Sequence, residues 1–458
     1  MCLFIYDILM AKQEYPTISL FSGAMGLDYG MENAGFKTRI AVEINKVAVE
    51  TIKANTKDLP VINSPIQQVS TMEILKGAGL SVGEAVVVQG GPCCQSFSTA
   101  GNRGSLSDPR GALFKDFCRI VGEAQPRFFV MENVTGLLSA AIKHRPLKER
   151  GPGFPPLAPE EELGSAFKVI LEELTTLNYH IIYGLLNAAD YGTPQIRLRV
   201  VIIGSRDGEE ISLPAPTHSK TGEKGKLKWV SLGKALRKVK SEEWSNFSEN
   251  TLSHLKYIKP GQNWTSLPET LQKEALGAAF ESWGGRKGFC RRLSYSSPAP
   301  SLTTAPNGRA TMLCHPEENR PLSVEEYMRI QEFPVGHIFE GSTSQKYILI
   351  GNAVPLSLGE AIGKGLLKTI RKTQKRGLPA DAETRKGIVQ CADPELEKRL
   401  NNRKKTQLPP PKHRLNPDPK AAKEWMAQVG ASIYAKNEHT KDIDVSYQKC
   451  CSPLPSHI

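Results

Sequence analysis

The chain has 458 residues, enough for two or three domains, and its 40% hydrophobic and 23% charged residues are typical of a globular protein with a buried core. Lys and Arg exceed Asp and Glu by 12, which favours a polyanionic partner. No apolar run approaches the roughly 20 residues of a membrane span, which excludes a transmembrane protein.

The first 206 residues alternate short β-branched runs with helical stretches such as Asn45–Asn55 and Phe167–Leu177. Seven runs are expected to be strands: Thr17–Phe21, Thr38–Val42, Val61–Asn63, Ala85–Gln89, Arg127–Met131, Tyr179–Leu186 and Leu198–Gly204. The alternation predicts an α/β fold with a doubly wound, mainly parallel sheet. The gap between Leu186 and Leu198 is too short for a helical crossover, so the seventh strand is expected to be antiparallel to the sixth.

Beyond residue 206 the pattern changes. Residues 207–290 are polar, rich in Lys, Ser and Trp and broken by prolines, which predicts a second, smaller domain. A Pro-rich insertion at residues 139–164 predicts a surface excursion. Helical patterns return at residues 323–333 and 356–369. Residues 371–458 carry 18 Lys and Arg against 10 Asp and Glu, which predicts a basic tail that is linker-like in part.

The first expected strand leads into LFSGAMGLDYG, residues 20–30. Gly23 and Gly26 at a strand-to-helix turn allow close backbone approach to a ligand. The spacing is not G-x-G-x-x-G, so a dinucleotide is disfavoured. Glu43 follows the second expected strand, where an acidic residue usually binds ribose hydroxyls. A plain structural turn is the alternative interpretation of this segment.

The fourth expected strand leads into QGGPCCQSFS, residues 89–98. A Cys in a Gly- and Pro-rich loop at the carboxyl end of a parallel strand lies where open α/β sheets bind ligands, and its thiolate is a strong nucleophile. Glu132, in MENVTG after the fifth strand, would lie beside this loop and pair a nucleophile with a proton donor. The alternative is a buried structural thiol.

The segment QIRLR contains Gln195, Arg197 and Arg199. In a strand, the alternation places both Arg side chains on one face, aimed at phosphate or base oxygens. A solvated basic edge strand is the alternative.

Together these motifs resemble the DNA (cytosine-5) methyltransferase family. The matching pieces are LFSGAMGLD, EIN, GGPCCQSFS, SDPRGALF, ENV, QIRLR, RRLSYSSPAPSLTT and GNAVP, in the order typical of the family, and they cover about residues 16–370. The resemblance implies a Rossmann-like, S-adenosylmethionine-dependent methyltransferase sheet, mostly parallel with its last strand antiparallel, and a smaller target-recognition domain. It implies S-adenosylmethionine as the co-substrate and no metal.

The resemblance also implies a mechanism. Cys94, directly before Gln-x-Phe-Ser, would attack C6 of a cytosine flipped out of the duplex, which makes C5 nucleophilic. Glu132 would engage N3 and the exocyclic amine, and Arg199 would contact O2. Asn133 would hold the neighbouring loop, and Arg197 would support Arg199 or bind phosphate. The expected catalytic residues are Cys94, Gln95, Glu132, Asn133, Arg197 and Arg199.

For the cofactor, the resemblance implies that Phe21 stacks on adenine and that Glu43 binds ribose. The expected cofactor-binding residues are Phe21, Ser22, Gly23, Ala24, Gly26, Leu27, Glu43, Ile44, Ile66, Leu113, Asn352 and Val354. Three positions depart from the family pattern. Cys93 replaces the usual Pro before the nucleophile, Met25 is expected to crowd the methionine end, and Pro65 replaces an Asp that would accept a hydrogen bond from adenine.

The resemblance further implies a domain organisation. The large domain is expected to comprise residues 1–206 and 335–370, and the small domain residues 207–334, with the target-recognition region at about 207–290. Residues 371–458 form the tail.

We expect the partner to be double-stranded DNA, with a cognate restriction endonuclease acting on the same site. We also expect a monomer in a prokaryotic cytoplasm, associated with the nucleoid and with no membrane. Two alternatives are an RNA cytosine-C5 methyltransferase and a catalytically inactive DNA-binding relative. The size of the recognition stretch disfavours the first, and the retained Cys94, Glu132, Arg197 and Arg199 argue against the second.

Overall fold

The computed structural model describes residues 14–92, 113–146, 149–150, 154–281 and 288–403. The chain divides into two compact units. The larger unit comprises Met1–His144, Ala158–Phe280 and Gly284–Asp393. It contains every helix and strand described below except α14 (Pro394–Arg403) and Glu281, the last residue of a 3₁₀ helix, which belong to the other unit.

An eight-stranded sheet with the order β12-β6-β8-β5-β4-β1-β2-β3 forms the centre of the larger unit. Its strands are β1 (Tyr15–Leu20), β2 (Phe36–Val42), β3 (Val61–Ile62), β4 (Val87–Gly90), β5 (Phe128–Val134), β6 (His180–Asn187), β8 (Leu198–Ser205) and β12 (Val389–Cys391). The pairs that β8 makes with β5 and β6 are antiparallel, and the other pairs of this sheet are parallel. The predicted fold class is therefore confirmed, including the antiparallel seventh strand.

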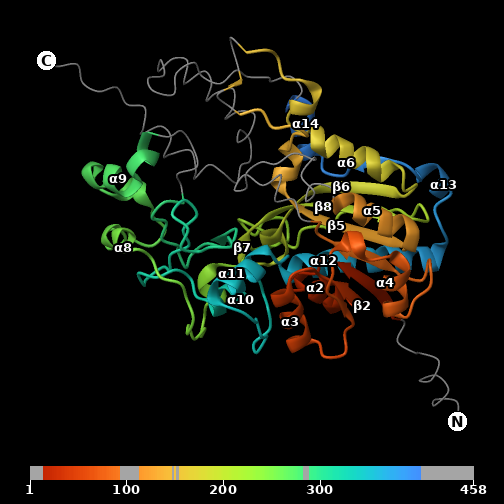
Figure 1. Ribbon diagram of the computed structural model, residues 1–458, viewed down its shortest axis with the longest axis horizontal. Helices are drawn as coiled ribbons and strands as arrows, with labels where there is room; N and C mark the ends of the chain where they lie inside the picture. Colours follow the sequence, from red (N-terminus) through yellow and green to blue (C-terminus); the bar gives the residue numbers. More distant parts are fainter. Residues whose placement is uncertain (1–13, 93–112, 147–148, 151–153, 282–287, 404–458) are drawn as a thin grey trace. The chain divides into compact units, whose positions relative to one another are not determined.

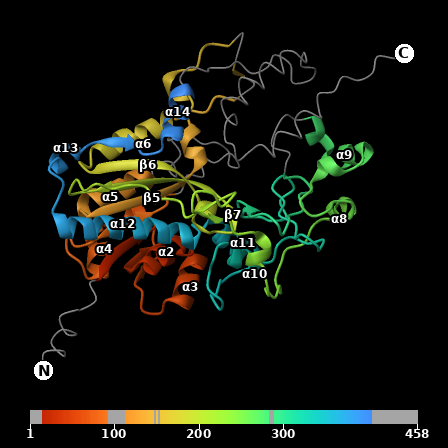
Figure 2. The ribbon, with the colours of Figure 1, turned by 180° about the vertical axis from the view of Figure 1, so that it is seen from behind.

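Helices cover both faces of this sheet (Figure 1). On one face, α2 (Gly26–Ala34) and α12 (Leu356–Arg376) share a core cluster with sheet residues such as Val87. On the other face lie α5 (Leu113–Ala124) and α6 (Ser165–Thr175), whose aromatic side chains contact β5 and β6. Figure 2 shows the same two layers from behind. Burial on both faces explains why the strands are continuously apolar.

Shorter elements complete the described part of the larger unit. Its other α-helices are α3 (Lys46–Asn55), α4 (Thr71–Ala78), α7 (Leu232–Ala235), α8 (Glu249–Leu255), α9 (Glu269–Leu276), α10 (Val324–Ile330), α11 (Thr343–Asn352) and α13 (Ala382–Arg385). Its 3₁₀ helices are η1 (Ile66–Gln68), η4 (Thr135–Ser139), η6 (Pro159–Glu161), η7 (Ala188–Tyr191), η8 (Trp264–Ser266) and η9 (Gly277–Glu281). Two small parallel pairs join β7 (Gln195–Ile196) to β11 (Ala299–Pro300) and β9 (His218–Ser219) to β10 (Leu227–Lys228).

Side-chain caps explain where two of these helices begin. Asn45 Oδ1 accepts hydrogen bonds from the N–H groups of Val47 and Ala48, at 2.9 and 3.3 Å, so α3 begins directly after it. Ser70 Oγ accepts from Glu73 N at 3.2 Å and starts α4 in the same way. Each side chain satisfies backbone donors that the first helical turn leaves free.

Residues 207–334 form short elements whose buried side chains divide between core clusters. Leu232, Leu302 and Tyr327 share a cluster with Ala24 and Ile350. A second cluster contains the aromatic residues Phe247, Trp264 and Phe289 together with Leu255 and Met312. The long parallel strands end before this region, as the break in the sequence pattern indicated. Among the described helices, none is long and apolar enough to cross a membrane.

The sequence pattern did not predict the last part of the sheet. Helix α12 continues to Arg376, and β12 pairs in parallel with β6 at the edge of the sheet. Ile181 N donates to Ile388 O at 2.9 Å, and Ala392 N donates to Tyr183 O at 2.8 Å. Residues 371–393 are therefore part of the folded sheet unit, and the basic segment outside that unit begins after Asp393.

Candidate active site

The strand order brings the predicted motifs to one edge of the sheet. Strands β1, β2, β4 and β5 are parallel neighbours, so their carboxyl ends lie together. The chain proceeds from β1 to β2 on one side and from β4 to β5 on the other, which places the topological switch point between β1 and β4. Because β8 is antiparallel, it begins at the same edge. Open α/β sheets bind ligands at this position.

Glu43 joins the turn after β1 to the turn after β2. Its side chain is 8% exposed, and each carboxylate oxygen accepts one backbone hydrogen bond. Gly23 N donates to Oε2 at 2.7 Å and Asn45 N donates to Oε1 at 2.8 Å. A carboxylate has about four lone-pair sites, so the carboxylate keeps acceptor capacity for the hydroxyls of a ribose. A Cβ added at Gly23 would meet no described atom within 4 Å, so this turn leaves room for a nucleoside.

The side chains expected to enclose the cofactor divide between accessible and buried positions. Ile44 is 62% exposed, Asn352 is exposed, and Phe21, Ser22 and Leu113 are half-buried. Ala24, Leu27, Ile66 and Val354 are buried. Ala24, Leu27 and Val354 belong to core clusters. These three side chains pack within the protein, so their contribution to a ligand site is mainly through the backbone that they fix in place.

Met25 does not crowd the site as expected. Its side chain is 1% exposed and packs in a cluster with Ala41 and Ile52, against Tyr29 and Val61. The reason is the left-handed backbone at Met25, with φ of 61°, which directs the side chain into the protein at the start of α2. The expectation of a clash with the methionine end of the cofactor was therefore wrong.

Gly26 allows a close contact between two segments of the chain. A Cβ at residue 26 would overlap the carbonyl oxygen of Val354. A Cβ at Gly351 would likewise lie 2.6 Å from the carbonyl oxygen of Thr303. These glycines allow close contact between segments of the chain itself, and Gly26 brings the GNAVP segment with Asn352 against the turn after β1.

Glu132 and Arg199 form an ion pair at the carboxyl edge. Arg199 Nε lies 2.6 Å from Glu132 Oε1, and each side chain is 11% exposed. Arg199 Nη1 also donates to Leu198 O at 2.8 Å. A Cβ at Gly91 would lie 3.1 Å from Glu132 Oε2, so the glycine directly before Pro92 leaves space for this carboxylate. The pair therefore lies beside the beginning of the QGGPCCQSFS loop.

Asn133 contacts the same loop directly. Its Nδ2 donates to Pro92 O at 3.1 Å, and its Oδ1 accepts from Val134 N at 2.9 Å. The structure thus brings Asn133 to the last described residue before the loop. Cys94 and Gln95 lie outside the described residues.

Arg197 is buried, and its partners differ from those of Arg199. It is 1% exposed, and its guanidinium donates to Gly351 O at 2.7 Å and Leu302 O at 3.2 Å. A side chain buried in this way does not reach a DNA phosphate, and the hydrogen bonds of its guanidinium join β8 to the segments at Leu302 and Gly351. Since Arg199 is also buried at 9% exposure, the alternative of a solvated basic edge strand is wrong.

Two glutamines bind the same chain segments as Arg197. The sequence pattern did not single out their interactions. Gln195 Nε2 donates to Gln331 Oε1 at 2.8 Å, and Gln195 Oε1 accepts from Leu302 N at 2.9 Å. Gln331 Nε2 in turn donates to Ile350 O at 2.6 Å and Ala353 O at 3.0 Å. Both side chains are fully buried. The Gln of QIRLR was the one available signal, but its partners come from segments more than a hundred residues away.

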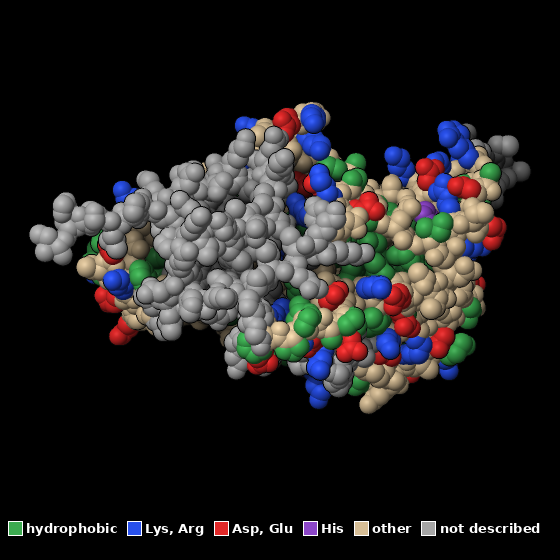
Figure 3. Space-filling model, turned by 90° about the horizontal axis from the view of Figure 1, so that it is seen from above, with side chains coloured by type: hydrophobic (Ala, Val, Ile, Leu, Met, Phe, Trp, Pro, Cys, Tyr) green, Lys and Arg blue, Asp and Glu red, His purple; other side chains and the backbone are tan. Residues whose placement is uncertain are grey.

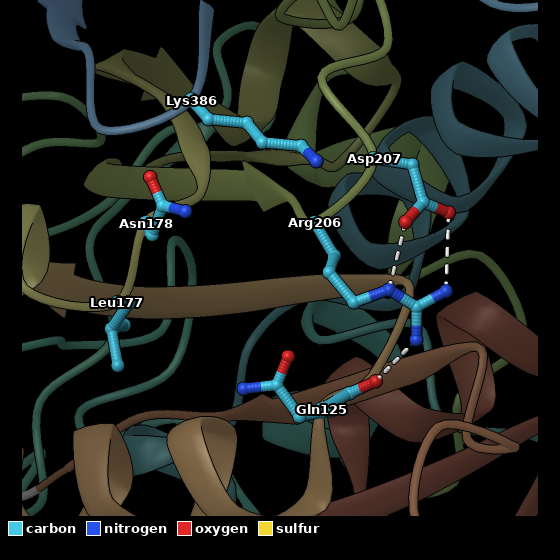
Figure 4. A pocket seen from close by; sticks show the side chains of 6 residues that line it. All are labelled: Gln125, Leu177, Asn178, Arg206, Asp207 and Lys386. Atoms are coloured by element: carbon cyan, nitrogen blue, oxygen red, sulfur yellow. Dashed lines mark hydrogen bonds and ion pairs between the residues drawn. The ribbon is translucent and has the colours of Figure 1, made fainter. Parts of the chain in front are cut away.

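On the described part of the face drawn in Figure 3, Lys and Arg side chains are interspersed with Asp and Glu side chains. Figure 4 shows a pocket at the other end of the strands, where β8 ends and β5 begins. It is lined by Gln125, Leu177, Asn178, Arg206, Asp207 and Lys386. Arg206 is fully paired there, with Asp207 at 2.8 and 3.1 Å and Gln125 O at 2.6 Å. This pocket contains none of the predicted site residues.

Comparison with known proteins agrees with this geometry. Residues 15–368 match the family described as C-5 cytosine-specific DNA methylase. Type II methyltransferase M.Sau96I of Staphylococcus aureus is 34% identical over 359 residues, which cover 78% of this chain and 76% of the relative. Type II methyltransferase M.Eco47II of Escherichia coli is 34% identical over 379 residues, covering 80% and 82%.

A similar fold occurs in the crystal structure of a candidate DNA modification methyltransferase encoded within an E. coli prophage. The TM-score is 0.54 at 24% sequence identity, and the match covers 78% of this chain and 99% of that chain. The match of the family over 354 residues and the relatives at 34% identity settle the classification. The chain belongs to the C-5 cytosine-specific DNA methylase family.

Proposed function

We propose that this chain methylates cytosine at C5 within a specific site of double-stranded DNA, with Cys94 as nucleophile and S-adenosylmethionine as co-substrate. Its family makes it a DNA (cytosine-5-)-methyltransferase. The observation that carries the residue assignments is the Glu132–Arg199 ion pair, at 2.6 Å, beside the loop that Asn133 contacts at Pro92.

The reaction requires a cytosine outside the base stack, since stacking covers the ring faces. Cys94 would attack C6, and the electron density would move to C5. Glu132 would hold N3 and the exocyclic amine and offset the charge that develops on the ring, while Arg199 would donate to O2. After methyl transfer, loss of the C5 proton allows elimination of Cys94 and leaves 5-methylcytosine. The burial of Glu132 and Arg199 supports these roles, because charges act more strongly where water is excluded.

S-adenosylmethionine supplies the activated methyl group when it is bound. Glu43 would accept hydrogen bonds from the ribose hydroxyls, using the lone pairs that the N–H groups of Gly23 and Asn45 leave free. Phe21 and the exposed Ile44 would flank the adenine, with Ile66 and Leu113 nearby. Asn352 would close the site from the C-terminal segment, which Gly26 allows to approach.

Residues 207–290 are proposed to recognise the bases around the target cytosine, within a small domain of residues 207–334. Part of this region packs in a cluster around Phe247, Trp264 and Phe289 that contains no residue of the large sheet, which supports a recognition module there. Lys, Arg, Asn and Gln side chains of this region suit major-groove recognition. Residues 1–206 and 335–370 would form the large domain.

The biological setting is proposed from the relatives, which are named type II methyltransferases. The chain would protect the sites of a cognate restriction endonuclease, acting as a monomer in a prokaryotic cytoplasm near the nucleoid.

Expression in a methylation-free host, followed by genome-wide bisulfite sequencing, tests this function. We expect 5-methylcytosine at one recurring sequence, its loss in Cys94→Ala, and its retention in the matched control Cys93→Ala. Labelled methyl incorporation into purified tRNA, with none into duplex DNA, would instead identify an RNA methyltransferase.

A further inference from the structure

Asp28 is a buried acid that the mechanism does not use. It lies in the first turn of α2 and is 2% exposed. Its carboxylate faces β1 and β4, where Ser19 and Gln89 supply hydrogen bonds. Strand β1 leads into the turn before α2, which we call the cofactor turn, and β4 leads into the QGGPCCQSFS loop, which we call the nucleophile loop. Asp28 therefore contacts the strand that precedes each of them.

The contact with β1 continues into the cofactor turn. Ser19 Oγ donates to Ser22 Oγ at 2.8 Å, and Ser22 Oγ in turn donates to Ser19 O at 3.3 Å and Val42 O at 3.5 Å. Ser22 precedes Gly23, whose N–H binds Glu43 at 2.7 Å. A hydroxyl has a single proton to donate. In the structure Ser19 gives this proton to Ser22, and an ionised Asp28, which can only accept, would compete for it. If Asp28 is protonated, it can donate to Ser19, which then donates to Ser22. The charge on Asp28 thus sets the direction of the hydroxyl chain.

The contact with β4 behaves in a similar way. Gln89 Nε2 donates to Asp28 Oδ1 at 2.6 Å, while the buried Gln89 Oε1 has no described hydrogen-bond partner. Nε2 suits an ionised Asp28, whereas Oε1 suits a protonated one after rotation of the amide. Gln89 is two residues before Gly91, which lies against the carboxylate of Glu132.

Retaining this charge lowers the stability of the fold at neutral pH. Burial raises the pKa of Asp28 from its ordinary 3.8 to about 6; hydrogen bonds from Ser19 and Gln89 oppose this shift, and Glu32 on the same helix adds to it. Its partners on the facing strands, Ser19 and Gln89, are uncharged, and Glu32 is the charged group that acts on it. An acid with a raised pKa binds more protons in the folded state, so folded stability falls as the pH rises from 3.8 to about 6. A neutral residue would be more stable here above pH 6.

We propose that Asp28 is a positioning residue whose ionised carboxylate orients the Ser19–Ser22 hydroxyls of the cofactor turn and the Gln89 amide before the nucleophile loop. One buried charge thus positions groups next to both the cofactor turn and the nucleophile loop. The inference rests on the proposed function and adds a residue that acts through others.

Asp28→Asn tests the role because it preserves the shape and removes the charge. At pH 8 we expect kcat/KM for S-adenosylmethionine to fall about tenfold, the effect of losing one hydrogen bond to a charged group. The ratio of the wild-type kcat/KM to that of the variant should fall toward one at pH 5, where Asp28 of the wild type is mostly protonated. Urea unfolding at pH 8 should show the variant to be more stable.

Two further variants test the contacts of Asp28 with Ser19 and with Gln89 separately. They keep the test decisive if Asp28→Asn folds poorly. Ser19→Ala should raise KM for S-adenosylmethionine with little change in kcat, and Gln89→Met should lower kcat with little change in that KM. Glu50→Gln, an exposed acid on α3, is the matched control and should behave as wild type.

Wild-type DNA methylation is measured first in the same assay. An inactive wild type would count against the proposed function. An active wild type with an equally active Asp28→Asn at pH 8, or with a ratio that does not change with pH, would overturn the role of Asp28.

Discussion

Glu132 and Arg199 are two expected site residues whose side chains bind each other directly. Their ion pair is 2.6 Å long and each side chain is 11% exposed. Removing one member of a buried pair leaves a charge without compensation, whereas replacing both with apolar residues of similar volume is often tolerated.

Arg199→Met should therefore destabilise the fold by about 3–5 kcal/mol and abolish methylation, because Glu132 would remain buried and unpaired. The double variant Glu132→Leu/Arg199→Met should recover most of the stability but none of the activity. Urea unfolding and methyl incorporation measure the two effects separately. A double variant as unstable as the single one would show that the pair does not account for the stability.

For single residues, the sequence was sufficient where the residue lies at or near a strand end. Glu43, Glu132 and Arg199 lie at the predicted edge because strand order alone brings them there. Met25 and Arg197 could not be placed in this way. The direction of Met25 depends on a left-handed backbone, and the partners of Arg197 are carbonyl groups from distant segments.

Helices α2 and α12 lie in close contact, and glycines allow it. A Cβ at Gly30 of α2 would overlap the carbonyl oxygen of Leu356 and lie 2.7 Å from Gly359 Cα. Backbone atoms cannot move aside as a flexible side chain does. Because both helices also frame the cofactor turn, their separation would affect the site.

Gly30→Ala should destabilise the protein by about 1–3 kcal/mol or more, since it overpacks a helix contact. Gly365→Ala on α12 is the matched control, because no described atom lies within 4 Å of its added Cβ. Alanine favours a helix more than glycine does, so the control should be neutral or up to about 1 kcal/mol more stable. Thermal unfolding of the two variants measures the difference, and equal stabilities would refute close packing at Gly30.

The main strands were predictable because they are apolar, several residues long and separated by helical stretches. Strand β12 was not, since it has three residues, is only partly buried and lies at the sheet edge. Its pairing with β6 depends on the fold that precedes it, including Gly208, where a Cβ would overlap the carbonyl oxygen of Ala382.

For the whole molecule, the fold separates the basic C-terminal segment into two parts. Residues 371–393 complete the sheet unit, and residues from Pro394 onward lie outside it. A truncation after Asp393 removes no strand of the sheet; it should lower non-specific DNA binding and flatten its salt dependence, because each phosphate contact contributes a slope near −0.9. The methylated sequence should stay the same.

A truncation after Gly377 is the comparison, since it also removes α13 and β12 and leaves the edge of β6 uncovered. It should lower the melting temperature. If the truncation after Asp393 changes the methylated sequence or leaves the salt slope of DNA binding intact, the basic segment does not have the proposed role.

The central claim, cytosine methylation through Cys94, is tested most directly by trapping the covalent intermediate. Duplex DNA with 5-fluorocytosine at the target position, incubated with the protein and S-adenosylmethionine, should form a stable adduct, because fluorine cannot leave C5 as a proton does. Peptide mapping should locate the attachment on Cys94. Attachment to Cys93, or the absence of an adduct with a preparation that methylates the same site containing cytosine, would contradict the mechanism.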